Sequence, residues 1–349
     1  HRTSRRQRQM CIRDRSLCKW FAKKIGFNDS SGGIAASGGT LSNLNALIAA
    51  RNNAGLGSNP NSVLLISEDA HSSFIKCIRI MGLDETNLIR IKTDNNGSID
   101  VQNLRKTINK CFIDNKKIFA IVATLGTTVR GAIDPIKEIS EICKERNIWL
   151  HIDGSIGGIF AVTSIPIEGL NNINQANSIT INPQKIIGIT KTSSLLLVSN
   201  MSTLENTFNT GLPYISSKEN IINRGEIGIQ GSRPAEVIKL WLGLRFLGLK
   251  GIENILKSSI KRKDFFVKNI SKNKFDIYSG PLHIVSFLPN KLEPKDSDAW
   301  TQTKVNELIN NNFMLSRPKF KGKYFLRVVM GNYNTKNSHI EELLRLLDA

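Results

Sequence analysis

Trp149-Leu-His-Ile-Asp-Gly-Ser-Ile-Gly-Gly158 begins as a buried strand and ends as a glycine-rich turn, with Asp153 where the strand gives way to the turn. A second strand, in Ser178-Ile-Thr-Ile-Asn-Pro-Gln-Lys185, is stopped by Asn182-Pro183, and Lys185 follows the stop. In open α/β sheets, ligands bind outside the carboxyl ends of the strands. The pattern therefore predicts that Asp153 and Lys185 meet over one small molecule at the edge of a sheet.

A carboxylate and a lysine placed in this way suit pyridoxal phosphate (PLP, pyridoxal 5'-phosphate). The lysine forms a Schiff base with the cofactor, and the aspartate keeps the pyridinium nitrogen protonated. The motifs His151-Ile-Asp-Gly-Ser-Ile-Gly-Gly158 and Asn182-Pro-Gln-Lys185 resemble those of the pyridoxal-phosphate-dependent group II amino-acid decarboxylases. The resemblance covers the chain from about residue 18 to its end. It implies an α/β, aspartate-aminotransferase-like fold (PLP fold type I): a three-layer large domain with a mainly parallel sheet, and a small C-terminal α+β domain.

Three parts are expected along the chain: a leader over residues 1–17, a PLP-binding large domain over 18–250, and a small domain over 251–349. Residues 1–15 contain six arginines, one aspartate and no apolar period, which predicts a non-native leader rather than a targeting peptide. A helix is expected to end at Gly26. Members of the family carry a substantial segment before this helix, so the chain is expected to be an N-terminally truncated fragment.

Composition narrows the function classes. A hydrophobic content of 40% and a charged content of 22% are typical of a soluble globular protein. No run of about 18 apolar residues occurs, so no membrane partner is expected. The net charge is +19, but Lys and Arg are scattered rather than clustered, and no nucleic-acid partner is expected. The five cysteines include no Cys-x-x-Cys pair, which argues against a metal site or disulfide framework and favours a cytoplasmic location.

A candidate phosphate site lies in Ala36-Ser-Gly-Gly-Thr40, where a glycine-rich turn leads into a helix. A helix N-terminus binds phosphate through its unpaired N–H groups and its dipole. Glycine-rich helix starts are common, so the turn alone is a weak signal. The resemblance implies that Gly39 and Thr40 bind the phosphate and that Ser37 and Gly38 shape the turn.

The resemblance also implies contacts with the cofactor ring. His71, in the motif Ala-His-Ser-Ser, would stack on the ring and could donate a proton, since the unperturbed pKa of histidine is about 6.5. Thr127 follows a strand expected over residues 118–125 and would donate or accept a hydrogen bond. The other predicted cofactor contacts are Ser155, Asn182, Gln184 and Ser232.

Gln184 and Ser232 differ from the other predicted contacts. Most family members have a histidine where this chain has Gln184, and a glutamine can hydrogen-bond a phosphate but cannot carry a proton. In the family, the turn that contains Ser232 approaches the phosphate of the partner subunit, so a homodimer is expected.

Three assignments stay open at the level of sequence. Lys191 competes with Lys185 for the cofactor, although it leads into a strand instead of following an Asn-Pro stop. Tyr214 lies where many family members have a tyrosine thought to protonate the substrate carbon, and it could equally be structural. Arg327 could bind a substrate carboxylate or pair on a sheet face.

The function expected is PLP-dependent decarboxylation of an L-amino acid to an amine and carbon dioxide through a Schiff base on Lys185, with His71 and Asp153 as the other catalytic residues. Two alternatives remain. One is another PLP reaction, such as aldehyde synthase, aldolase or aminotransferase chemistry, because fold and cofactor do not fix the reaction. The other is a basic binding protein without catalysis.

Overall fold

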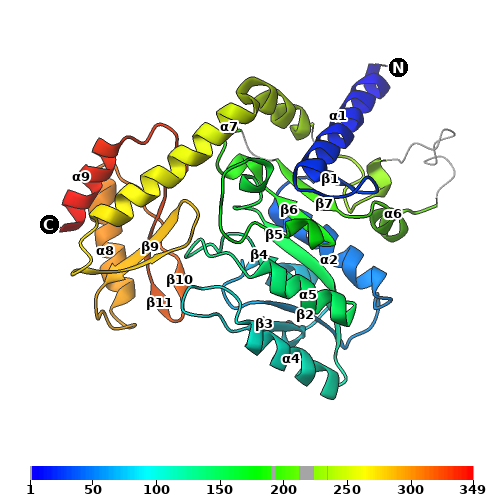
Figure 1. Ribbon diagram of the computed structural model, residues 1–349, viewed down its shortest axis with the longest axis horizontal. Helices are drawn as coiled ribbons and strands as arrows, with labels where there is room; N and C mark the ends of the chain where they lie inside the picture. The colour runs from blue at the N-terminus through cyan, green and yellow to red at the C-terminus, as the bar shows by residue number, and fades with distance from the viewer. Residues whose placement is uncertain (1, 190–192, 212–223, 234, 349) are drawn as a thin grey trace.

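The computed structural model describes residues 2–189, 193–211, 224–233 and 235–348, with side chains from Ile12 onward. At its centre is a seven-stranded sheet in the order β1-β7-β6-β5-β4-β2-β3 (Figure 1). The strands are β1 (Gly32–Ala36), β2 (Ser62–Ser67), β3 (Leu88–Ile91), β4 (Lys117–Thr124), β5 (Trp149–Gly154), β6 (Ser178–Ile181) and β7 (Ser194–Val198). Within this sheet β7 alone runs against its neighbours, which confirms the predicted mainly parallel sheet.

Helices cover both faces of this sheet and make the predicted three layers. One face packs on α1 (Arg2–Lys24), α4 (Val101–Ile113) and α5 (Ile136–Arg146). The other packs on α2 (Gly39–Asn53), α3 (Ser73–Ile80) and α6 (Ser202–Phe208). The central strands are buried on both faces, which explains why they read as nearly continuous apolar runs in the sequence.

The ends of three parallel strands line up at one edge of the sheet. Thr124 of β4 pairs in register with Asp153 of β5, and Asp153 with Thr180 of β6. Because β4, β5 and β6 point the same way, the residues that follow these strands emerge together. This register brings the two stretches that predict the fold to a common edge.

Helix α7 (Glu236–Asn269) leads from the sheet to a second, smaller unit (Figure 1). Its backbone leaves helical geometry at Gly248, with φ 62° and ψ 173°, and the predicted division at residue 250 falls just after this break. The smaller unit has an antiparallel sheet and a core of its own, to which Phe266 contributes. Its main elements are β8 (Phe275–Ser279), β9 (Ile284–Pro289), α8 (Ser297–Asn310), β12 (Leu326–Val329) and α9 (Asn337–Asp348). A two-stranded ribbon, β10 (Lys319–Phe320) with β11 (Lys323–Tyr324), precedes β12.

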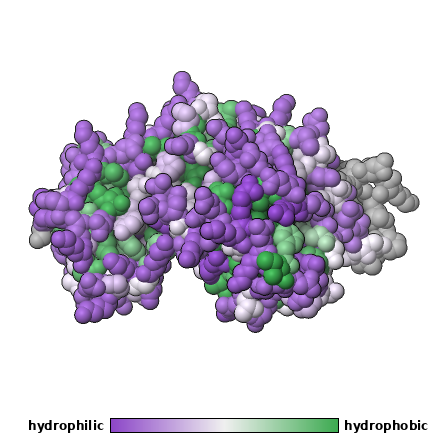
Figure 2. Space-filling view, turned by 60° about the horizontal axis from the view of Figure 1, so that its bottom comes forward, coloured by the Kyte–Doolittle hydropathy of each residue, from purple (hydrophilic) through white to green (hydrophobic). Residues whose placement is uncertain are grey.

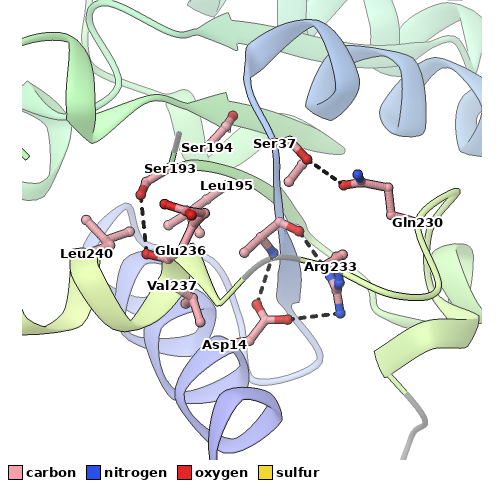
Figure 3. A pocket seen from close by; sticks show the side chains of 12 residues that line it. Asp14, Ser37, Ser193, Ser194, Leu195, Gln230, Arg233, Glu236, Val237 and Leu240 are labelled. Carbon is pink, nitrogen blue, oxygen red and sulfur yellow. Dashed lines mark hydrogen bonds and ion pairs between the residues drawn. The ribbon is translucent and has the colours of Figure 1, made fainter. Parts of the chain in front are cut away.

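Helix α1 crosses the boundary expected at residue 17. Asp14 is buried at 3% exposure, accepts a hydrogen bond from the Ala35 N–H at 2.9 Å, and forms an ion pair with Arg224. A second ion pair joins it to Arg233 (Figure 3). Leu17 is buried in the main core. The segment is therefore anchored by an ion-pair cluster and an apolar contact, neither of which an apolar period would reveal.

The small unit contacts both the turn that follows β5 and the loop that follows β4. His283 stacks on Phe160 with ring centroids 6.1 Å apart, and the Gly280 N–H donates to the Arg130 carbonyl at 2.6 Å. Arg327 donates through NH1 to the Thr128 carbonyl, also at 2.6 Å. The loop at residues 126–131 is consequently held from two sides.

The surface is largely hydrophilic on the face that Figure 2 shows, with apolar side chains in smaller areas between the polar ones. The outline of this face is notched between the small unit and the unit that carries the large sheet. Across the described helices, none has the length and apolar character needed to cross a membrane.

His283 gives a prediction about stability in acid. Burial, and then the charge of Arg262, lowers its pKa to about 4 from 6.5. The unfolded chain takes up the proton below pH 6.5 and the folded chain does not, so this contribution is absent above pH 6.5 and destabilises as the pH falls toward 4. The expected loss is on the order of 3 kcal/mol.

We expect His283→Phe, which keeps an aromatic ring against Phe160, to reduce the acid-induced fall in the free energy of unfolding. Urea unfolding of both proteins at several values between about pH 7 and pH 4.5 measures the difference. If the free energy of unfolding fell equally with pH in both proteins, His283 would not be the source of the acid sensitivity.

Candidate active site

Asp153 lies at the carboxyl end of β5 with 5% of its surface exposed. Its Oδ1 accepts a hydrogen bond from the Ser155 N–H at 3.1 Å, and its Oδ2 accepts one from the Asn43 side-chain amide at 3.2 Å. A carboxylate has four lone-pair positions, so each oxygen can still accept another donor. Asp153 is thus held by two donors and can pair with a third, cationic group.

Lys185 ends a short turn, Pro183–Lys185, directly after β6. Desolvation by the surrounding protein lowers the pKa of its amine, Asp153 raises it, and Arg327 lowers it, with a net shift downward. The side chain is nevertheless accessible at the surface of the site. A lowered pKa increases the fraction of the amine that is unprotonated and therefore nucleophilic.

His71 precedes α3 and is also accessible. Its Nδ1 lies 2.8 Å from the Ser73 hydroxyl and accepts from the Ser73 N–H at 3.1 Å. Desolvation lowers its pKa against the opposing effect of Asp153, and Lys185 and Arg327 are among the charges that lower it further. The imidazole is therefore mostly neutral at pH 7. The same charges act on His71 and Lys185, so the structure brings both side chains into one site with Asp153.

The N-terminus of α2 meets the same strand ends. Gly38 precedes the helix with φ 134°, and the first hydrogen bonds of the helix are donated by Leu41 and Ser42 to the Gly38 carbonyl. A Cβ atom at Gly39 would lie 2.6 Å from Asn182 Nδ2 and 2.8 Å from Ser155 Oγ. These two side chains converge on the helix start, where the preceding N–H groups are available to an anion.

The residues present fit pyridoxal phosphate on observations that are independent of one another. Gly39 leaves a cradle that a side chain would fill, beside the donor groups Asn182 Nδ2 and Ser155 Oγ. Asp153 offers a carboxylate to a ring nitrogen, and Lys185 offers an amine with a lowered pKa. A phosphate, a cationic ring nitrogen and an aldehyde would each find a suitable group here.

Three further predicted contacts are placed in different ways. Thr127 is buried, and its hydroxyl oxygen accepts from the Ala132 N–H at 3.1 Å, which leaves the hydroxyl proton available. Gln184 accepts from the Ser193 N–H through its side-chain oxygen. Ser232 is exposed. Its segment is tied to the turn before α2 by a 2.9 Å bond from Ser37 to Gln230 (Figure 3).

Of the open assignments, Lys191 and Tyr214 lie outside the described residues. Arg327 comes from β12 of the small unit, and its charge lowers the pKa values of His71 and Lys185. It also donates hydrogen bonds to Ser316 and Thr128. Asn43 was not expected in the site. The signal that could have found it is a polar residue in a helix that is buried all round.

Comparison with known proteins identifies the family. Residues 10–287 match the model of the pyridoxal-dependent decarboxylase conserved domain. The chain is 30% identical to an aromatic-L-amino-acid decarboxylase of Bacillus atrophaeus over 94% of this chain and 70% of that protein. It is 28% identical to an L-aspartate decarboxylase of Metarhizium robertsii over 97% of this chain and 70% of that protein.

Solved structures show the same fold. The TDC structure from Oryza sativa with PLP and tryptamine has a TM-score of 0.89 at 18% identity, covering 97% of this chain and 75% of that one. The structure of mouse CSAD has a TM-score of 0.87 at 24% identity, covering 97% and 76%. Together with the match over residues 10–287, these comparisons show that the chain belongs to the pyridoxal-dependent decarboxylases, a family of PLP-dependent carboxy-lyases.

Proposed function

We propose that this protein decarboxylates an L-amino acid to the corresponding amine, with pyridoxal phosphate bound to Lys185. The observation that carries the proposal is the lowered pKa of an accessible lysine in the field of Asp153, at the strand edge where the family motif occurs. When bound, the cofactor supplies an electron sink for the bond that breaks at the α-carbon. The protein's own side chains supply binding, orientation and protons.

Asp153 and His71 would act on the cofactor ring. The carboxylate of Asp153 holds the proton on the ring nitrogen by charge pairing in a site of low polarity. The imidazole of His71, whose pKa lies below 6.5, would face the cofactor and could accept or donate a proton there. Thr127 keeps a hydroxyl proton that can be donated to the cofactor.

The phosphate would bind at the start of α2. We assign its contacts to the N–H groups of Gly39 and Thr40 and to the side chains of Ser155 and Asn182, which converge there. The amide nitrogen of Gln184 would add a donor, as its oxygen is already used by Ser193. Ser232 would contribute from the neighbouring segment, in the same or a second subunit.

Arg327 would hold the substrate carboxylate. Its Nε and NH1 donate to Ser316 and Thr128, whereas NH2 has no partner in the described part of the chain. A fixed carboxylate decides which bond of the α-carbon stands perpendicular to the ring, and hence which bond breaks. By fixing the substrate carboxylate, Arg327 would favour breakage of the bond that joins this group to the α-carbon.

The proposal does not specify the side chain of the substrate, because the named relatives act on both aromatic and acidic amino acids. We also propose that the protein is a homodimer in the cytoplasm. The support is the resemblance to the family, together with apolar side chains exposed on α7 (Leu242, Phe246 and Leu249) that a second copy could cover.

The role of Lys185 can be tested through the absorbance of the bound cofactor. The purified protein with added PLP is expected to show a visible absorbance band that borohydride reduction fixes covalently, and Lys185→Ala should lose both, because no amine remains to hold the aldehyde. Lys191→Ala is the matched control and should retain the band. A band that survives in Lys185→Ala and disappears in Lys191→Ala would transfer the role to Lys191.

The reaction is tested on the same preparations. Incubation with a panel of L-amino acids should release carbon dioxide and the amine in equal amounts from at least one of them. Release of an aldehyde, or an amino-group transfer without carbon dioxide, would favour the alternative PLP reactions over decarboxylation.

Substitution of Gly39 tests the phosphate site. Gly39→Ala should weaken PLP binding by about tenfold or more, since the new Cβ would meet Asn182 and Ser155 at less than 3 Å. Gly57→Ala adds the same group where nothing lies within 4 Å and should bind PLP like the unmodified protein. Titration of the absorbance band gives both dissociation constants; equal values would place the phosphate elsewhere.

A further inference from the structure

Asp153 is the end of a buried series of hydrogen bonds that reaches back through the sheet. The Trp149 indole N–H donates to Ser178 Oγ at 2.8 Å, and Ser178 Oγ lies 2.8 Å from His151 Nδ1. His151 Nε2 lies 3.1 Å from Asn43 Oδ1, and the Asn43 amide donates to Asp153 Oδ2 at 3.2 Å. All five residues are at most 6% exposed.

The carboxylate end of this series fixes the direction of its bonds. An indole nitrogen can only donate, and an ionised carboxylate can only accept. Asn43 must therefore turn its NH₂ group to Asp153 and its oxygen to His151. His151 then carries its proton on Nε2, and Nδ1 accepts the proton of the Ser178 hydroxyl.

The opposite direction of these hydrogen bonds is unfavourable at Asp153. With the proton of His151 on Nδ1, Nε2 would need a donor from Asn43, and the oxygen of Asn43 would face the carboxylate of Asp153. Two acceptors would then meet without a proton in a buried place, which costs far more than a hydrogen bond gains. The pKa of His151 is lowered by burial to about 4, which agrees with a neutral imidazole in this position.

We propose that Trp149, Ser178, His151 and Asn43 form a one-way chain of hydrogen-bond donors that holds the carboxylate of Asp153 aimed at the cofactor's ring nitrogen. Asn43 and His151 are thus positioning residues, which act on the cofactor through Asp153. The inference rests on the proposed function, because it takes Asp153 as the partner of the ring nitrogen. Its effect is specific: it concerns the ring nitrogen and not the phosphate or the aldehyde.

The test compares PLP with a deaza analogue in which a C–H group replaces the ring nitrogen. In the unmodified protein PLP should bind more tightly than the analogue, because only PLP can pair with Asp153. Asn43→Leu removes the last donor of the chain at similar side-chain volume, and the ratio of the two dissociation constants should shrink by about tenfold. The ¹⁵N chemical shift of the ring nitrogen in labelled PLP should move toward the unprotonated value.

Ser42→Ala is the matched control. Ser42 is the neighbour of Asn43 in α2, is fully buried, and hydrogen-bonds Ser194 at 2.7 Å outside the chain. Its ratio and its ¹⁵N shift should equal those of the unmodified protein. Ser178→Ala, which removes the proton supplied to His151 Nδ1, should change both in the same direction as Asn43→Leu and decides the question if Asn43→Leu does not fold.

Each result points to one conclusion. A ratio near one in the unmodified protein would refute the pairing of Asp153 with the ring nitrogen, and with it that part of the proposed function. A large ratio that Asn43→Leu and Ser178→Ala leave unchanged would refute the donor chain alone. Equal weakening of PLP and of the analogue would mean that these residues only support the fold.

Discussion

The site depends on keeping a negative charge where little water reaches it. Asp153 is 5% exposed, and an uncompensated charge in such a place costs several kcal/mol. The surrounding structure offsets this cost with fixed donors. One comes from the turn after β5, through the Ser155 N–H, and the other from α2, through Asn43. The position of α2 against the sheet is therefore set by electrostatics as well as by the packing of apolar side chains.

The sequence was sufficient for the parts of the site that lie close together along the chain. Asp153 and Lys185 follow strands whose ends can be recognised from apolar periodicity and from the Asn182-Pro183 stop. The fold class followed from the motifs around them, and the seven-stranded, mainly parallel sheet confirms it. Their neighbourhood in space is a direct result of the parallel pairing of β5 with β6.

Other contacts depend on segments that are distant in the sequence, and no local pattern predicts them. Asn43 reaches Asp153 across 110 positions, and it stands in a helix that is buried nearly all round, where the local sequence does not show which buried polar residue meets the site. Asp14 forms its ion pairs with Arg224 and Arg233, which are distant in the sequence, so the local pattern predicted only a non-native leader for its segment. In both cases a polar side chain is buried because its partner arrives from elsewhere, and hydrophobic periodicity does not register such a residue.

Arg327 connects the small unit to the candidate site. The guanidinium donates a hydrogen bond to the carbonyl of Thr128, next to Thr127. Its charge also lowers the pKa values of Lys185 and His71. An anion that binds this guanidinium would also affect its hydrogen bond to Thr128, and thus the contact between the two units. Occupancy of the site and order at the seam between the units are therefore thermodynamically linked: whatever stiffens one favours the other by the same free energy.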